Sequence, residues 1–357
     1  MALDFTHTTL GQRVRFGAGQ AAENLAAEVT RLGATSVMVI ASERGLPDAR
    51  RVAADIDVAV WHTDVAMHVP VETADRAREV AARNGVDLLV SVGGGSATGL
   101  AKAVALTTGI PVVAVPTTYS GSEATDVWGL TEDGRKTTGH AGQVLPVTVI
   151  YDAQLALSLP EELSVASGLN ALAHCVDSLW APAADPVNAA LAGEGARVLA
   201  EGLPRIVDDP GDIDGRDAAF YGGYLAAVAF ASAGSGLHHK ICHVLGGSFG
   251  LPHAQTHATV LPYVLAFNAP DAPDAERRLA GAFGSETAVD GLQRLRRRVN
   301  APQRLADLGF RHADVPRAVD LILDVVPASN PRPVSAADLT VLLSAACAGE
   351  DPAVVAA

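Results

Sequence analysis

The chain has 357 residues, 49% of them hydrophobic and 18% charged, so it is long enough to form two domains with substantial cores. Its formal net charge of −14 argues against a nucleic-acid partner and against binding to an anionic membrane surface. The three cysteines are widely spaced, which predicts reduced thiols. We find no signal-peptide pattern at the N-terminus and no apolar run of roughly 20 residues, so we expect a cytoplasmic protein without a membrane span.

Short apolar runs alternate with helical periodicity in the first part of the chain. We expect one or two short strands within residues 5–16, and buried strands at 36–41, 58–61, 87–92, 111–116 and 147–150. The helices expected between them cover 20–32, 48–56 and 71–84, with one more starting at the glycine-rich turn 93–96. This alternation predicts a Rossmann-like, doubly wound parallel sheet.

The pattern changes near Asp152, after which no convincing strand remains. Helical periodicity predicts helices at 160–180, 187–206, 216–232, 236–247, 253–267, 272–282, 288–300, 313–325 and 336–348. We therefore expect an α/β dinucleotide-binding domain over residues 1–155 and an all-helical substrate and catalytic domain over 156–357. We expect the active site in the cleft between the two domains.

Two loops in the first domain have the composition of a cofactor site. Gly93, Gly94, Gly95 and Ser96 lie between a strand and a helix, where bare backbone and the helix N-terminus suit a diphosphate, although a plain tight turn gives the same pattern. The next strand ends in Thr117-Thr118-Tyr119-Ser120, whose polar groups suit nicotinamide and ribose or a substrate, or simply cap the strand.

Ser42 follows the strand at 36–41, where an adenine ribose would lie. An acidic residue there would select NADH by repelling a 2′-phosphate, and this chain has none at that position. We therefore expect Ser42 to accept NADH or NADPH, with an ordinary polar turn as the alternative.

Five of the eleven histidines lie between residues 238 and 257. His239 and His243 stand four apart on a predicted helix, and His253 follows a glycine-rich turn at 246–250. Asn170 and His174 form a second pair with the same spacing. Such a group predicts either a metal site or a pocket that handles protons, while His238 and His257 are as readily bystanders.

Four motifs in chain order carry a family resemblance: 93–96, 116–118, 168–174 and 239–253. Together they resemble the iron-containing alcohol dehydrogenase family over nearly the whole chain. Within that family the chain is most similar to the maleylacetate reductases, on the segments 93–102, 116–123, 128–132, 135–139 and 237–247.

The resemblance implies a set of site residues. Metal-dependent members of the family bind their ion with one Asp and three His, and the matching positions here are Asn170, His174, His239 and His253. The family's non-ligand catalytic histidine matches His243. Asn170 departs from the pattern because an amide lacks the charge that offsets a divalent cation. Gly99 also replaces a family Asp. Both departures resemble the maleylacetate reductases, so we expect no metal requirement.

The resemblance implies that NADH or NADPH reduces the carbon–carbon double bond of maleylacetate, or of substituted maleylacetates, to 3-oxoadipate in aromatic catabolism. We expect His243 to be the general acid or enolate stabiliser. His239, His253 and His174 would hold the substrate's carboxylates or ketone, because a nearby dianion favours the charged form of an imidazole. We expect the dicarboxylate substrate to contact His174, Asn170, Tyr119 and Lys240. A homodimer is also implied.

Two alternative functions and the role of one loop stay open. A metal-dependent alcohol dehydrogenase or aldehyde reductase would use Asn170, His174, His239 and His253 as ligands. A lyase or synthase with the similar dehydroquinate-synthase-like fold would need a full metal set and more Lys and Arg than this chain offers. The loop at Arg135-Lys136 suits a substrate carboxylate or is a solvated charge pair.

Overall fold

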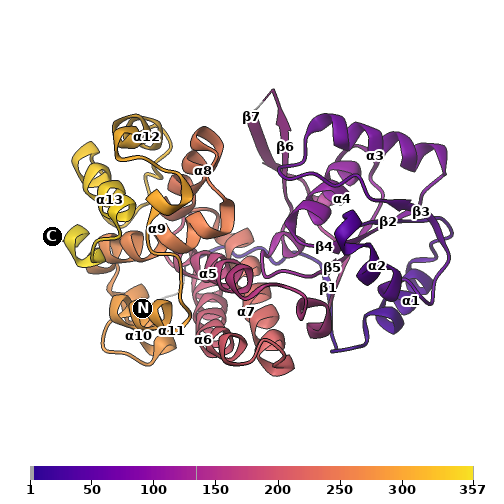
Figure 1. Cartoon of the computed structure of the whole chain (residues 1–357), viewed down its shortest axis with the longest axis horizontal. Coiled ribbons are helices and arrows are strands. Elements are labelled where there is room, and N and C mark those ends of the chain that lie inside the picture. Colours follow the sequence, from indigo (N-terminus) through magenta and orange to yellow (C-terminus); the bar gives the residue numbers. More distant parts are fainter. Residues whose placement is uncertain (1–3, 134, 357) are drawn as a thin grey trace. The chain divides into compact units, whose positions relative to one another are not determined.

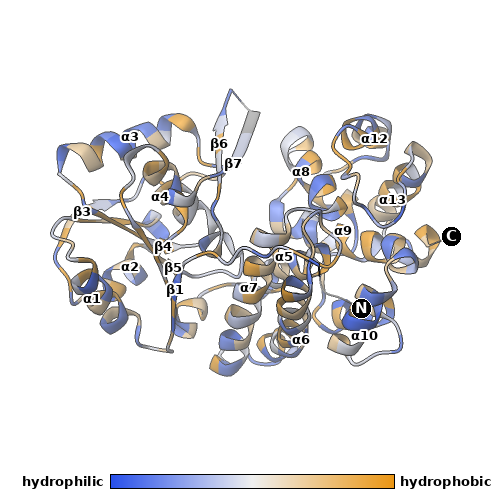
Figure 2. Ribbon diagram, turned by 180° about the vertical axis from the view of Figure 1, so that it is seen from behind, coloured by the Kyte–Doolittle hydropathy of each residue, from blue (hydrophilic) through white to orange (hydrophobic). Residues whose placement is uncertain are grey.

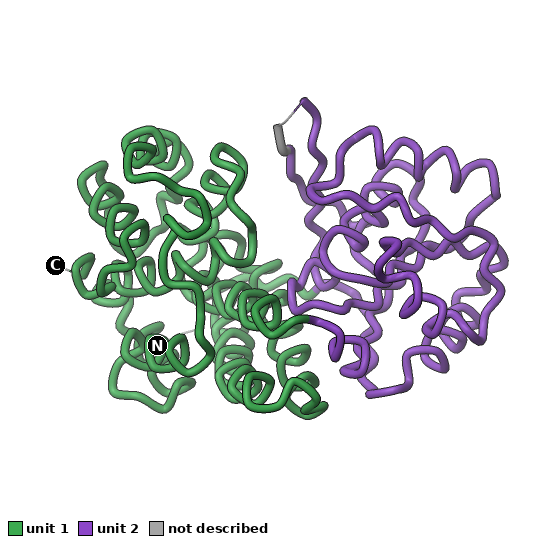
Figure 3. Tube along the Cα trace, in the orientation of Figure 1, with its two compact units in different colours: residues 1–9, 160–357 green, residues 10–159 purple. Residues whose placement is uncertain are grey.

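The computed structural model describes residues 4–133 and 135–356, without the side chains of Arg135 and Lys136, so the loop expected to bind a carboxylate lies outside the described side chains. The chain divides into two compact units (Figure 3): residues 10–159 form an α/β unit, and residues 160 onward form a helical unit together with the segment up to Thr9. Within the described residues, no helix combines the length and apolarity needed to cross a bilayer.

Six parallel strands form the sheet of the α/β unit, in the order β1-β8-β5-β4-β2-β3 (Figure 1). The strands are β1 (Arg13–Phe16), β2 (Val37–Ile40), β3 (Val58–His62), β4 (Leu88–Gly93), β5 (Val112–Pro116) and β8 (Thr148–Tyr151). The predicted parallel sheet is therefore confirmed, and Figure 2 colours its central strands hydrophobic. Residues 5–12 form no strand, because only 13–16 pair with β8.

Helices cover both faces of this sheet, because its central strands β2 and β5 are apolar and buried at every position. In β2, Val37 and Val39 pack into one core and Met38 and Ile40 into the other. The first core includes residues of α1 and α2, and the second includes residues of α3 and α4. The helices are α1 (Ala21–Leu32), α2 (Leu46–Val52), α3 (Val71–Arg83) and α4 (Gly95–Thr108).

The order of the strands creates a switch point between β2 and β4. From β2 the chain runs outward to β3 through α2, whereas from β4 it runs the other way to β5 through α4 on the opposite face. Ligands of open α/β sheets bind outside the carboxyl ends of the strands at such a point. Ser42, the turn 93–96 and the loop 117–120 all follow the carboxyl ends of β2, β4 and β5.

A two-stranded antiparallel hairpin, β6 (Val127–Glu132) with β7 (Arg135–His140), was not expected from the sequence. The hairpin side chains that the structure describes are half-buried or exposed, so the alternation of apolar and polar residues that marks a strand is weak. Trp128 lies opposite Gly139, where a Cβ atom would stand 2.7 Å from the indole ring. The glycine therefore makes room for the ring across the hairpin.

All the helices expected between residues 160 and 348 are present, and the described residues after Tyr151 form no strand. The helices are α5 (Glu161–Ser178), α6 (Pro186–Asp208), α7 (Ile213–Ala233), α8 (Leu237–Phe249), α9 (His253–Asn268), α10 (Pro273–Phe283), α11 (Ala288–Arg298), α12 (Val315–Leu323) and α13 (Ala336–Ala348). The expected turn at 246–250 is wrong in part, because Gly246 and Gly247 continue α8 and the helix ends at Gly250 in the left-handed conformation.

Helix α5 is the buried centre of the helical unit, with every residue from Ser164 to Ser178 buried. A Cβ atom at Gly168 would lie 2.3 Å from a methyl carbon of Leu203 on α6. Glycine therefore allows α5 and α6 to pack closely. A helix fixed in this way holds its polar side chains at defined positions.

Candidate active site

The glycine-rich turn opens α4 with unsatisfied backbone N–H groups. Gly93 has φ of 147°, a conformation that favours glycine, and the helix N-cap is Gly94, which offers no side-chain hydrogen bond. The first N–H groups of a helix have no partner within the helix. The turn is half-buried to exposed, so these donors can meet a diphosphate.

The second predicted cofactor loop lies against this turn. The backbone N–H of Thr117 donates to the carbonyl of Gly93 at 3.1 Å. A Cβ atom at Gly94 would approach the Thr118 side chain to 3.0 Å, and one at Gly95 would lie 3.5 Å from Ser120 Oγ. Tyr119, expected to touch substrate, is buried, with 1% of its surface exposed. The structure thus brings the two polar loops together and leaves room between them only because the turn lacks side chains.

Lys102, a buried lysine of α4, holds the segment that follows this loop. Lys102 Nζ donates to the carbonyls of Ser122 and Val127 at 2.6 and 2.8 Å, and to Thr125 Oγ1 at 3.1 Å. Burial lowers the pKa of the Lys102 ammonium to about 7. The lysine therefore anchors the segment that connects β5 to the hairpin.

Ser42 has a structural role at the end of β2. Its Oγ accepts a hydrogen bond from the backbone N–H of Gly45 at 3.2 Å and caps the short 3₁₀ helix Glu43–Gly45. This contact is the one expected if Ser42 belongs to an ordinary polar turn. Arg44 in the same turn is exposed.

In the helical unit, α5 presents Asn170, His174 and Asp177 at positions that share one face of the helix. All three side chains are buried. Asp177 was missed in the sequence, although its place three residues after His174 put it on the same face. Asp177 is found by continuing one more helical turn from the pair Asn170 and His174 along the same face.

The histidines expected at the site form one cluster, to which α5, α8 and α9 contribute. The rings of His174 and His239 stack with centroids 4.8 Å apart, and Phe230 lies 4.7 and 4.3 Å from them. The His243 ring lies 6.0 Å from that of His239. The ring of His257 lies between those of His253 and His239, with centroid distances of 4.4 Å to His253 and 4.8 Å to His239.

Exposure divides this cluster. His174 and His239 are 8% and 2% exposed, whereas His243 and His253 are open to solvent. Lys240, the other expected substrate contact, is half-buried in the first turn of α8. The cluster therefore has a buried part and a solvent-exposed part, and the exposed part contains His243, the expected general acid.

Asp177 orients the interior of the cluster. Its carboxylate accepts the Nδ1–H of His239 at 2.7 Å, the indole N–H of Trp180 at 3.1 Å and the backbone N–H groups of Gly236 and His239 at 3.1 Å each. It therefore caps α8 from a neighbouring helix, and a Cβ atom at Gly236 would lie 2.6 Å from its oxygen. With Nδ1–H donated to Asp177, the neutral ring of His239 directs an unprotonated Nε2 to the other side.

Burial keeps the interior histidines neutral. It lowers the pKa of His174 to about 4 and that of His238 to about 3, and it also lowers the pKa of His239 and His257. Burial therefore favours the neutral forms of His174 and His239, whereas their charged forms were expected beside a bound dicarboxylate. The physical reason is desolvation, which outweighs the attraction of Asp177 for a proton on His174.

These lowered pKa values predict loss of stability in mild acid. Unfolding exposes four histidines whose pKa returns to about 6.5, so below that pH the unfolded chain binds protons that the folded chain does not. The free energy of unfolding should fall by about 1.4 kcal/mol per pH unit for each such histidine, between about pH 6 and 4. Urea unfolding at pH 7.5 and 5.0 measures this. Equal stability at both values would show that the four rings are not buried as neutral groups.

The residues at the family's metal positions fit a divalent cation poorly. Asn170 Oδ1, His174 Nδ1 and His239 Nε2 are buried and have no hydrogen-bond partner among the described residues, so they are poised to contact a ligand. None of them, nor His253, carries negative charge. Within the described part of the chain, the group of side chains found close enough to hold a metal ion is His238, Cys242 and His257, which includes none of these three histidines. Neutral donors suit polar groups of an organic substrate better than Fe²⁺.

Comparison with known proteins gives consistent matches over the whole chain. The model of the iron-containing alcohol dehydrogenases matches residues 11–153, and that of the Fe-containing alcohol dehydrogenase family, C-terminal, matches residues 164–347. Maleylacetate reductase 2 of Cupriavidus pinatubonensis is 46% identical over 347 residues, which are 96% of this chain and 96% of that protein.

Solved structures agree with these matches. An iron-containing alcohol dehydrogenase from Corynebacterium glutamicum is 64% identical with a TM-score of 0.98, covering 99% of this chain and 100% of that one. The maleylacetate reductase of Agrobacterium tumefaciens is 39% identical with a TM-score of 0.94, covering 98% and 100%. The predicted resemblance is therefore confirmed at the level of family and fold.

Proposed function

We propose a function from the premise that this chain belongs to the iron-containing alcohol dehydrogenase family and is an oxidoreductase. The reaction is the NADH- or NADPH-dependent reduction of the carbon–carbon double bond of maleylacetate to 3-oxoadipate, without a catalytic metal. The observation that carries the metal-free proposal is the neutral donor set, with Asn170 where metal-dependent members have a carboxylate. The names of the relatives support the substrate.

The α/β unit has the features to hold the cofactor. The backbone N–H groups of Gly94, Gly95 and Ser96 bind the diphosphate at the N-terminus of α4, and a side chain at Gly94 would close this space against Thr118. Thr117, Thr118 and Ser120 position the ribose and nicotinamide. When bound, NADH or NADPH supplies a hydride.

The substrate is an enone with two carboxylates, and reduction adds a hydride to the carbon β to the ketone and a proton to the α carbon. Negative charge develops on the ketone oxygen between these two additions. A hydrogen-bond donor at that oxygen lowers the barrier. In neutral His239 the N–H points to Asp177, so this ring offers an acceptor rather than a donor. The exposed His243 is therefore the donor and the source of the proton.

The remaining site residues bind the substrate's carboxylates. Lys240 and His253 lie on the accessible side of the cluster and supply cationic or N–H groups. His174 and Asn170 contribute neutral donors from the buried side. This division places charge compensation near solvent and shape recognition in the interior, where an unpaired charge would be costly.

The test is NADH oxidation with maleylacetate by protein treated with a chelator and assayed for iron and zinc. We expect full turnover at negligible metal content, and no gain on adding Fe²⁺ or Zn²⁺. Inactivity on maleylacetate, combined with reduction of simple aldehydes that Fe²⁺ or Zn²⁺ restores, would instead establish a metal-dependent alcohol dehydrogenase. In that case Asn170 would be an unusual amide ligand.

A further inference from the structure

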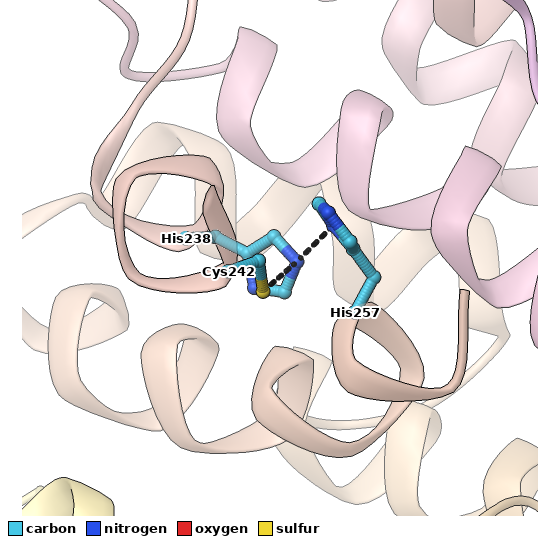
Figure 4. A group of neighbouring side chains, drawn as sticks. All are labelled: His238, Cys242 and His257. Carbon is cyan, nitrogen blue, oxygen red and sulfur yellow. Dashed lines mark hydrogen bonds between the residues drawn. The ribbon is translucent and has the colours of Figure 1, made fainter. Parts of the chain in front are cut away.

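A second group of side chains lies behind the site, among residues to which the proposed reaction gives no role. His238 and Cys242 stand one turn apart on α8, and His257 faces them from α9 (Figure 4). The Nε2 atom of His238 lies 3.0 Å from His257 Nδ1 and 3.6 Å from Cys242 Sγ. The three ligand atoms lie within 4.8 Å of one another, and all three residues are buried.

We propose that His238, Cys242 and His257 form a binding site for a thiophilic transition-metal ion such as Zn²⁺, separate from the positions where metal-dependent family members hold theirs. A tetrahedral zinc ion has bonds of about 2.0–2.1 Å to nitrogen and about 2.3 Å to sulfur, which puts ligand atoms about 3.3–3.8 Å apart. The two separations from His238 Nε2 lie within a few tenths of an ångström of that range. The third pair, Cys242 and His257, has ligand atoms within 4.8 Å, so these two side chains close on the ion by rotation.

Charge favours this cluster over the family positions. Asn170, His174, His239 and His253 are neutral donors, whereas Cys242 coordinates as a thiolate and gives its proton to solvent when the ion binds. Burial raises the pKa of the Cys242 thiol, so without an ion the sulfur keeps its proton and the group is a neutral hydrogen-bonded chain. A soft or borderline cation that enters the helical unit is therefore expected at the sulfur.

The surroundings set the expected strength of binding. His238 Nδ1 and His257 Nε2 have no hydrogen-bond partner among the described residues, whereas tightly held metal ligands usually donate their outer N–H to a fixed acceptor. The protein supplies three ligands and not four. We therefore expect weaker binding than at a structural zinc site with four protein ligands, and a rise in melting temperature with ion concentration because the ion links α8 to α9.

The experiment is titration of the chelator-treated protein with Co²⁺. Sulfur coordination produces a near-ultraviolet thiolate-to-cobalt charge-transfer band, and the family positions contain no sulfur. We expect the band to saturate at one ion per chain, to disappear in Cys242→Ser and to persist in the matched variant Cys175→Ser, which changes another buried thiol. The Cys242→Ser change should weaken binding by more than the about 10- to 100-fold typical of a lost outer partner.

If the serine variant folds poorly by circular dichroism, His257→Gln is the second variant: it keeps the sulfur but removes one nitrogen ligand, so a higher Co²⁺ concentration should be needed to reach the same band. Absence of the band in the parent protein, or its loss in Cys175→Ser but not in Cys242→Ser, overturns the proposal. The readouts are absorbance and melting temperature, so either outcome leaves the proposed reductase function standing.

Discussion

Asp177→Asn lowers the turnover of maleylacetate by about 100-fold or more, while the KM for NADH stays unchanged. An asparagine keeps the size of the side chain but not its two acceptor oxygens. The His239 ring then loses the acceptor that fixes its Nδ1–H, so it can rotate or take the other tautomer. Steady-state kinetics with maleylacetate and NADH measure the effect, and the cofactor loops on the other unit should be unaffected.

Asp185→Asn is the matched control for this variant. Asp185 is also a buried capping carboxylate in the helical unit, accepting backbone N–H groups of α6 and the Nδ1–H of His7 at 2.8 Å. Both variants should lose about 1–3 kcal/mol of stability because each removes a buried acceptor from a helix N-terminus. Only the Asp177 variant should lose turnover. Equal losses of activity in the two would reduce Asp177 to a purely structural cap.

The fold could be predicted where side-chain pattern alone decides it. Four-residue apolar runs such as Val37–Ile40 can be buried only on both faces, so they indicate a parallel sheet covered by helices. The hairpin β6–β7 was not predicted, because the half-exposed residues of β6 form no apolar run in the sequence. Similarly, Gly246 and Gly247 suggest a turn by propensity, but both lie within α8, which continues to Phe249.

The site could be predicted in composition but not in charge state. The spacing of His239 and His243 placed both on one helix face, and the structure brings them together with His174. Burial is a property of the packed unit, so local spacing does not reveal that His174 and His239 are neutral. The contact between Asp177 and His239 joins residues 62 positions apart, which local spacing cannot reveal.

These charge states restrict the choice of proton donor. An interior imidazole with a strongly lowered pKa can give up a proton readily but rarely holds one at neutral pH. His174 and His239 are in that condition, and the donor must be reloaded after each turnover. His243 is exposed and lies next to His239, so it can exchange protons with water. This division between a neutral interior and a solvated edge is why we propose His243 as the proton donor.

His243→Ala should lower kcat by about 100- to 10,000-fold, the usual contribution of a general acid, with a smaller change in the KM for maleylacetate. Because the side chain is exposed, its removal should hardly change the melting temperature. Added imidazole should restore part of the activity by filling the vacated space. The primary isotope effect from NADH deuterated at the transferred position should fall toward one, because protonation becomes limiting.

His312→Ala is the control, since His312 is an exposed histidine of the same unit outside the cluster. It should leave kcat, the isotope effect and the response to imidazole unchanged. Undiminished turnover in His243→Ala would remove this residue from the mechanism. A loss that imidazole does not rescue, with the isotope effect intact, would mean that His243 positions the substrate for hydride addition without delivering the proton. Solvent would then supply the proton directly, and the donor at the ketone oxygen would have to be His253 or Lys240 on the same accessible side.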